Sequence, residues 1–208
     1  MRFHVALVQP DTLREYLEQH GQGIETKHYE LYAAILLANF HRQQHDGEYL
    51  IALPAKRGRE KERELELDIG ELPESHSDED SPVDVAIVPA TEVENRKYKR
   101  PKGYAYQLKR LICKDSDTEQ CIADFLGKVA KKYSKTEAAL VLLLEHVDAA
   151  DRVLNLARVR ELFAPAEFPF GSVLFVAGNR PAHALVMGEL WPGIGATEYP
   201  YEVLLGRL

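Results

Sequence analysis

AALVLLL, at residues 138–144, is an uninterrupted apolar run. Such a run is typical of a strand that is buried on both faces of a sheet. A helical pattern precedes it at residues 116–133, and a second one follows at about 150–163. Another buried strand, SVLFVA, is predicted at residues 172–177. Strands that alternate with helices in this order predict parallel crossovers, so we expect an α/β layer.

Two further strands are predicted before this layer. VDVAIV at residues 83–88 ends at Pro89, and YAYQLKRLI follows at residues 104–112. Two successive strands most simply pair as an antiparallel hairpin. The basic connection at residues 90–103 would then be the extended tip of that hairpin.

The first third of the chain predicts a long helix at about residues 25–42. A turn at Asp46-Gly47 separates it from a strand at residues 48–53. The helix has one apolar stripe at the spacing of a buried face. The stripe consists of Tyr29, Tyr32, Ala33, Leu36, Leu37 and Phe40. Shorter elements are predicted as strands at residues 3–8, 64–69 and 183–190 and as a helix at residues 12–20.

The helix at residues 116–133 has two possible N-terminal caps. Ser116 and Glu119 fit a capping box, and Asp117 is the alternative cap. The sequence leaves the choice between them open.

The composition is that of an ordinary globular protein. The chain has 208 residues, of which 45% are hydrophobic and 28% charged, which suits a single domain over residues 1–208. No apolar run approaches the roughly 20 residues that cross a bilayer, and no signal peptide is recognisable. Cys113 and Cys121 cannot form a disulfide framework. We therefore expect a reduced, cytoplasmic protein without a membrane partner.

Charge is distributed unevenly along the chain. The net charge of −7 argues mildly against a nucleic-acid partner, because phosphate binding depends on Lys and Arg. Residues 71–81 form an acidic segment that we expect to be a flexible loop. Local basic patches matter more than the net charge when a groove attracts phosphate. The residues that we single out for such contacts are Arg96, Lys97, Lys99, Arg100, Lys102, Lys128 and Lys132.

Three polar residues in the predicted hairpin suggest a chemistry. Asp84 begins the first strand, and Gln107 and Lys109 lie two apart on the second, so they share one face. In an antiparallel hairpin the start of one strand lies beside the end of the other. We therefore expect Asp84 to lie near Gln107 and Lys109. A carboxylate and an amide oxygen are hard ligands that suit Mg²⁺. A nearby Lys would stabilise the negative charge that develops when a phosphodiester is hydrolysed.

Val83-Asp84 followed by Gln107-Leu108-Lys109 resembles the PD-(D/E)xK nuclease motif in its Q-x-K form, which occurs in nucleases similar to the Mrr restriction group. The core of that superfamily has the order helix, three strands, helix, strand, which the chain follows over about residues 25–147. The family often has a Glu on the first helix in an E-x-x-A pattern. Glu30 to Ala33, ELYA, fits this pattern.

The resemblance implies a restriction-endonuclease-like fold, in which helices flank a central mixed sheet, with extra C-terminal strands over about residues 164–208. It implies a metal-dependent DNA endonuclease that uses Mg²⁺ or Mn²⁺. Asp84 and Gln107 would be its metal ligands, Lys109 its catalytic lysine and Glu30 an accessory acid. A duplex-cutting enzyme of this kind is often a homodimer, although nothing in the sequence shows the oligomeric state.

The chain departs from the family pattern in three ways. Val83 separates Pro82 from Asp84, Gln107 replaces an acidic residue, and the spacing from Asp84 to Gln107 is long. A catalytically silent interaction or assembly module on the same fold is therefore the first alternative. An unrelated α/β domain that binds a small molecule near residues 145–148 or in the Gly-rich tail is the second.

Each site residue also has a purely structural interpretation. Gln107 and Lys109 could form the solvent face of an edge strand, and Asp84 could pair with Arg110. Glu30 could be an exposed helix residue that pairs with Lys27. His41 and His45 have a spacing that can hold a metal on a helix, but surface histidines are the simpler interpretation.

Overall fold

The structure is a computed structural model, and it describes residues 2–13, 15, 28–54, 63–66, 68, 83–94, 101–113, 117–145, 154–163, 167–179, 184–201 and 203. The chain forms two compact units. The first contains Met1–Ile69, Val83–Tyr106 and Glu202–Leu208, and the second contains Gly70–Pro82 and Gln107–Tyr201. One strand passes from the first unit into the second. The acidic loop predicted at residues 71–81 and the helix predicted at 12–20 fall largely or wholly outside the described residues.

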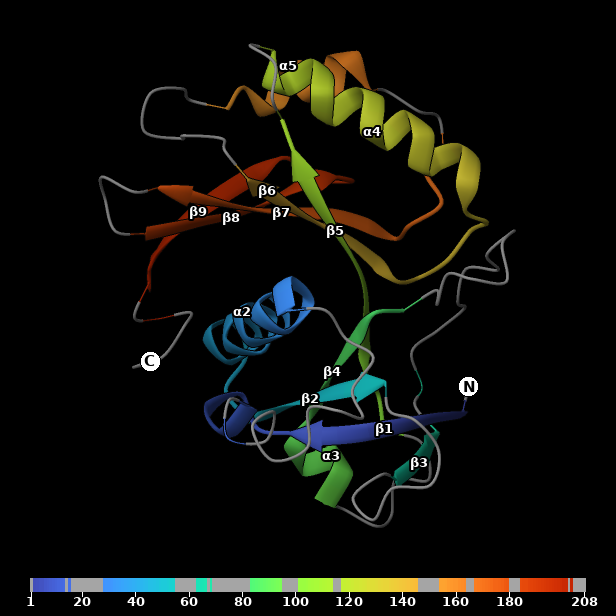
Figure 1. Cartoon of the computed structure of the whole chain (residues 1–208), viewed down its shortest axis with the longest axis vertical. Coiled ribbons are helices and arrows are strands. Elements are labelled where there is room, and N and C mark those ends of the chain that lie inside the picture. Colours follow the sequence, from blue (N-terminus) through green and yellow to red (C-terminus); the bar gives the residue numbers. More distant parts are fainter. Residues whose placement is uncertain are drawn as a thin grey trace. The chain divides into compact units, whose positions relative to one another are not determined.

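The first unit contains an antiparallel sheet with the strand order β3-β1-β2-β4-β5 (Figure 1). The register of β4 against β5 pairs Val85 with Tyr106 and Ile87 with Tyr104. The antiparallel pairing predicted for these two strands is thereby confirmed. The strands are β1 (Arg2–Val8), β2 (Tyr49–Pro54), β3 (Arg63–Glu66), β4 (Val85–Pro89) and β5 (Tyr104–Ile112), of which the last continues into the second unit.

Helix α2 (His28–Gln44) packs against β2 and β4 and supplies much of the core of the first unit. The apolar stripe predicted for it was too narrow. Tyr32 is 39% exposed, whereas residues 33, 34 and 36–39 are all buried. A helix that is covered over most of its circumference shows a weak amphipathic pattern, which explains the error.

The connection between β4 and β5 differs from the extended hairpin tip that we expected. It begins with a short helix, α3 (Ala90–Glu94), directly after β4. Five-residue helices carry too little hydrophobic periodicity to be recognised in a basic, polar segment.

Another short turn of helix, η1 (Pro10–Thr12), follows β1.

The second unit contains the strand order β5-β6-β7-β8-β9. Strands β6 and β7 are parallel, which confirms the predicted crossover, whereas β7-β8 and β8-β9 are antiparallel. Helices α4 and α5 pack together on one side of these strands (Figure 1). The elements are α4 (Thr118–Lys132), β6 (Ala139–Glu145), α5 (Leu156–Leu162), β7 (Ser172–Asn179), β8 (Ala184–Trp191) and β9 (Gly195–Pro200).

Each unit has its own apolar core. Leu36, Leu37 and Ile87 are fully buried in the first unit. Ile122, Leu126, Phe170 and Phe175 fill the second unit, where α4 covers the sheet. The chain is therefore a mixed α/β protein with antiparallel and parallel strand pairs, as the sequence predicted. None of the helices within the described residues is long and apolar enough to cross a membrane.

Several predicted boundaries need correction. Asp117 caps α4, because its carboxylate accepts a hydrogen bond of 3.1 Å from the backbone N–H of Gln120. Helix α5 begins only at Leu156, capped by Asn155, rather than near residue 150. Strand β8 is not the last strand, because β9 follows it and forms the edge of the sheet.

Candidate functional site

Glu30 lies in the first turn of α2, in the first unit. It is only 6% exposed, and it is the one carboxylate among the buried side chains that the structure describes. Its interpretation as an exposed helix residue is therefore wrong, and Lys27, the partner suggested for it, lies outside the described residues. Burial of a carboxylate is costly unless it has compensating interactions or a metal, and Glu30 does interact with other groups.

Asp84 lies immediately before β4 and is half-buried. Its backbone N–H donates a hydrogen bond of 2.9 Å to the carbonyl oxygen of Tyr106 on β5. This hydrogen bond extends the β4–β5 ladder by one residue. Both partners of this hydrogen bond belong to the first unit.

Gln107 and Lys109 follow on β5, in the part of the strand that belongs to the second unit. Gln107 is 1% exposed and Lys109 is half-buried. Strand β5 lies between β4 and β6 in the strand order, so it is not an edge strand. The interpretation of Gln107 as part of a solvent face is therefore wrong.

The basic residues predicted to contact phosphates divide between the two units. Lys102 is exposed in the first unit, and its backbone N–H donates to the Glu92 carboxylate at 2.5 Å. Lys128 and Lys132 are exposed on α4 in the second unit. The other four, Arg96, Lys97, Lys99 and Arg100, lie outside the described residues.

The oxygen atoms of Asp84 and Gln107 are of the type that a hard cation prefers, but they are few. Within the described part of the chain, no group of three or more His, Cys, Asp or Glu side chains could hold a metal ion. Mg²⁺, however, typically keeps several waters and takes only one or two protein carboxylates together with substrate phosphates. The carboxylate of Asp84 and the amide oxygen of Gln107 are ligands of that kind.

The burial of one histidine on α2 was not predicted from the sequence. His41 is 5% exposed, which corrects its interpretation as a surface residue, whereas His45 is exposed as expected. His41 Nε2 and the hydroxyl of Tyr106 share a hydrogen bond of 2.5 Å, and the ring of Tyr104 lies 4.2 Å from the imidazole. His41 follows the buried Leu37 by four residues, and this helical spacing was the available signal.

The surroundings of His41 change the acid–base behaviour of the cluster. Burial, and to a lesser extent the charge of His45, lowers the pKa of His41 to about 4. Burial, followed by the influence of Tyr104 and Tyr49, raises the pKa of Tyr106 well above its usual value. Both side chains are therefore neutral at pH 7, and they form an uncharged hydrogen-bonded pair.

Comparison of the chain with protein-family models, with curated proteins and with solved structures finds no significant match in any of the three. The assignment of a function therefore depends on the residues and on the geometry of the chain itself.

Proposed function

We propose that the protein is a metal-dependent endonuclease of the PD-(D/E)xK type that hydrolyses phosphodiester bonds of DNA. The observation that carries the proposal is the burial of Glu30 and Gln107. Six polar or charged residues are buried within the described residues, and these two are among them. Both also belong to the motif that resembles the PD-(D/E)xK pattern.

Burial of these residues requires a physical reason. A glutamine or a glutamate in an apolar core costs free energy unless its polar atoms are satisfied. Natural cores keep such groups mainly where they form networks or serve a site. A site that binds a metal ion and a phosphate is one such use, and glutamate and glutamine side chains can serve in it.

The order and pairing of the elements also support the proposal. Along the chain, α2, β2, β4, β5, α4 and β6 follow the helix, three strands, helix, strand order of the nuclease core. Strand β3 and the short helix α3 both interrupt this sequence order. Strand β3 pairs with β1, so that β2, β4 and β5 remain antiparallel neighbours. The extra strand therefore leaves the series of three intact.

Each of the four residues has a distinct role in the proposed reaction. Asp84 and Gln107 would hold Mg²⁺ or Mn²⁺, which when bound lowers the pKa of a water and polarises the phosphate. Lys109 provides a positive charge that stabilises the negative charge developing on the phosphate oxygens. Glu30 orients the metal ligands or accepts a proton from the attacking water.

The proposed setting and partners follow from the same assignment. Lys102, Lys128 and Lys132, together with the basic residues 96–100, would contact the DNA backbone. The reduced cysteines suit a cytoplasmic location, because Cys113 and Cys121 are both free. A homodimer would provide one site for each strand of a duplex.

The test is cleavage of supercoiled plasmid and of single-stranded DNA with Mg²⁺ or Mn²⁺. The wild type should cut with metal, and a chelator should abolish cutting. Lys109→Ala should lower the rate by roughly 10²- to 10³-fold, as loss of a charge-stabilising group does. Lys131→Ala is the matched control, because Lys131 is an exposed lysine on α4. Equal rates for the two lysine variants would contradict the role of Lys109.

A wild type that cuts nothing, and whose melting temperature neither metal raises, would exclude the enzyme. The first alternative, a silent interaction module on the same fold, would then be the better account. The feature that favours this alternative is Gln107, which stands where the nuclease family has an acidic residue. The metal site therefore has one negative charge fewer.

A further inference from the structure

The second unit contains a pocket of about 430 Å³, within the range of small-molecule sites. The residues that line it come from the C-terminal end of α4, from the segment before β7 and from the end of β8. They are Ala130, Tyr133, Lys135, Glu167, Phe168, Pro169 and Trp191. None of them is a candidate of the proposed nuclease site, and all lie within one unit.

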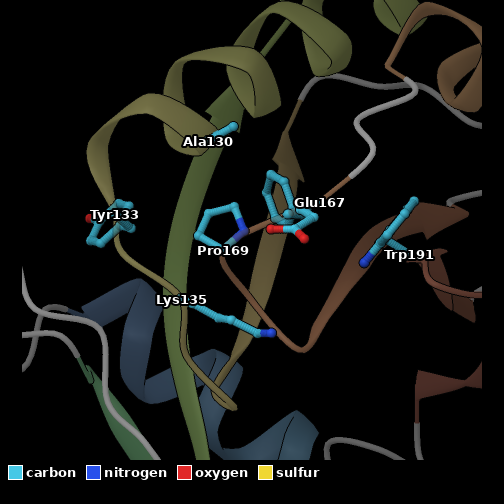
Figure 2. Close-up of a pocket in the computed structure, with 7 residues that line it drawn as sticks. Ala130, Tyr133, Lys135, Glu167, Pro169 and Trp191 are labelled. Atoms are coloured by element: carbon cyan, nitrogen blue, oxygen red, sulfur yellow. The ribbon is translucent and has the colours of Figure 1, made fainter.

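The pocket combines an apolar floor with a few polar groups. Tyr133, Phe168 and Pro169 are buried, whereas Lys135 and Glu167 are exposed. Figure 2 shows the ammonium of Lys135, the carboxylate of Glu167 and the indole nitrogen of Trp191 around the space between Pro169 and Trp191, with the ammonium below Pro169 in this view. Two of these groups are donors and one is a pure acceptor.

Trp191 is held in place as one wall of this pocket. The Arg160 guanidinium lies over the indole ring, 5.0 Å from its centroid, and donates hydrogen bonds to the carbonyl oxygens of Pro192 and Gly193. Arg160 does not line the pocket, so a ligand meets the indole from another side. The β7–β8 register shifts beside Trp191, which pairs with Val173, and such bulges redirect side chains next to binding sites.

The floor of the pocket is also fixed before any ligand binds. The backbone N–H of Thr136 donates to the carbonyl of Pro169 at 2.6 Å, and the N–H of Gly171 donates to that of Ala138 at 3.0 Å. The ring of Tyr133 packs edge-on against Phe170 at 5.3 Å. A preorganised pocket loses less conformational entropy when it binds a ligand.

We propose that this pocket binds a guanine nucleotide. The indole of Trp191 would contact the planar base, as aromatic side chains do when they bind nucleotides. Glu167 would read the base edge, and Lys135 would pair with the phosphate. The Lys132 ammonium, 5.5 Å from the Tyr133 ring centroid, adds positive charge beside the pocket.

The carboxylate is the group that selects guanine. A carboxylate accepts two hydrogen bonds side by side and donates none. The Watson–Crick edge of guanine presents two neighbouring donors, N1–H and N2–H₂. Adenine and cytosine present an amino group beside an acceptor nitrogen, and uracil presents one N–H between two carbonyls. Glu167 therefore matches both donors of guanine and would leave a repulsive or unpaired contact with the other bases.

The binding test uses tryptophan fluorescence, because Trp191 is the only tryptophan of the chain. GMP, AMP, CMP and UMP are titrated separately, with free N-acetyltryptophanamide as the correction for absorbed light. GMP should change the fluorescence saturably and bind at least about tenfold more tightly than AMP. No saturable change with GMP, or equal affinity for AMP, would overturn the proposal.

Two variants assign the contacts. Glu167→Gln should reduce the preference for GMP over AMP by about tenfold, because one of the two accepted hydrogen bonds is lost. Lys135→Ala should reduce the preference for GMP over guanosine, since the phosphate loses its partner. Lys131→Ala is the control, because Lys131 is exposed on α4 but does not line the pocket. Unchanged preferences in both pocket variants would contradict the assignment.

A guanine with a 5′-phosphate can be a free mononucleotide or part of a single strand. Oligothymidylates with one central guanine or one central adenine distinguish these sources. Tighter binding of the guanine oligonucleotide than of both GMP and the adenine oligonucleotide would identify a strand as the ligand, and tighter binding of GMP would identify the free nucleotide. The nuclease assay is separate, so either proposal can fail without the other.

Discussion

His41 shows how its surroundings determine the behaviour of a single residue. The imidazole is buried against tyrosine rings, and it shares its Nε2 with the Tyr106 hydroxyl. A charged imidazole would lose its hydration there, which is why burial is the larger cause of its lowered pKa. The folded state therefore keeps His41 neutral at a pH where an unfolded chain would protonate it.

Stability should consequently depend on pH through His41. The folded pKa of about 4 lies below the ordinary value of 6.5, so the unfolded state binds more protons between these values. The contribution is complete above pH 6.5 and is lost as the pH falls toward 4, by about 3 kcal/mol in total. Urea unfolding at pH 7.5 and at pH 4.5 measures this loss.

Two variants isolate the contribution of His41 to that loss. His41→Gln should flatten the pH dependence, because the titrating ring is gone. His45→Gln should retain most of it, because repulsion by His45 is only the smaller cause of the lowered pKa. A His41→Gln variant with the same pH dependence as the wild type would contradict this account.

Sequence reasoning could select Glu30 and Gln107 as site residues, but it could not establish their burial. A single Glu in a helix that is covered over most of its circumference follows no amphipathic pattern. Gln107 lies between apolar residues on β5, and only the position of that strand between β4 and β6 shows that it is internal. Burial arises from strand neighbours that are distant in the sequence, which periodicity does not encode.

At the scale of elements, Asp117 contributes to two helices. Its Oδ1 caps α4 at the N–H of Gln120, and its Oδ2 pairs at 2.7 Å with Arg158 of α5. Arg158 in turn donates its backbone N–H to Asn155, the N-cap of α5. The packing of α4 against α5 is thus tied to both helix starts.

Replacement of Asp117 should show which of these functions matters more. Asp117→Ala should lower the free energy of unfolding by about 1 kcal/mol through loss of the cap. Asp117→Asn retains the capping oxygen and loses only a half-exposed ion pair, so it should cost less than about 0.5 kcal/mol. Chemical denaturation measures both, and equal costs for the two variants would contradict the capping role.

Replacement of glycine by alanine should have opposite effects on stability at Gly188 and at Gly127. A Cβ on Gly188 of β8 would overlap the carbonyl oxygen of Gly195 and lie 2.5 Å from Phe175 Cε1. Gly188→Ala should therefore destabilise the protein by about 2 kcal/mol or more, through overpacking where β8 meets β9. Gly127 of α4 has no neighbour within 4 Å of such a Cβ.

Gly127→Ala is accordingly the control for Gly188→Ala. It should raise the free energy of unfolding by about 0.5–1 kcal/mol, because alanine restricts the unfolded chain and favours the helix interior. Thermal or urea unfolding of both variants gives the comparison. Stabilisation by both substitutions would show that β8 and β9 do not approach each other as described.

The elements that the sequence predicted are those whose burial is continuous or cleanly periodic, such as β6, β7 and α4. Strand β9 was missed because its residues are mostly exposed and follow a Gly- and Pro-rich segment. Its pairing with β8 defines it, and pairing between strands is not a local property. The parallel crossover could be predicted because a helix between two buried strands has few alternatives.

At the scale of the whole molecule, β5 is the element that matters most to the proposed function. It begins in the first unit beside β4 and continues into the second with Gln107 and Lys109. The prediction of a single nuclease-like domain over residues 1–208 stays a prediction. The two proposals depend on different parts of this molecule, since the nucleotide pocket uses only residues of the second unit.

The most direct test of the nuclease proposal is the initial rate of plasmid cleavage by Asp84→Asn in Mg²⁺ or Mn²⁺. This substitution keeps the shape of the side chain and removes the charge that would hold the metal. Asp124→Asn is the matched control, because Asp124 is exposed on α4. We predict that the wild type and Asp124→Asn cut alike, while Asp84→Asn is at least roughly 10²-fold slower and still folded. Cleavage by Asp84→Asn at the wild-type rate would contradict the proposed site.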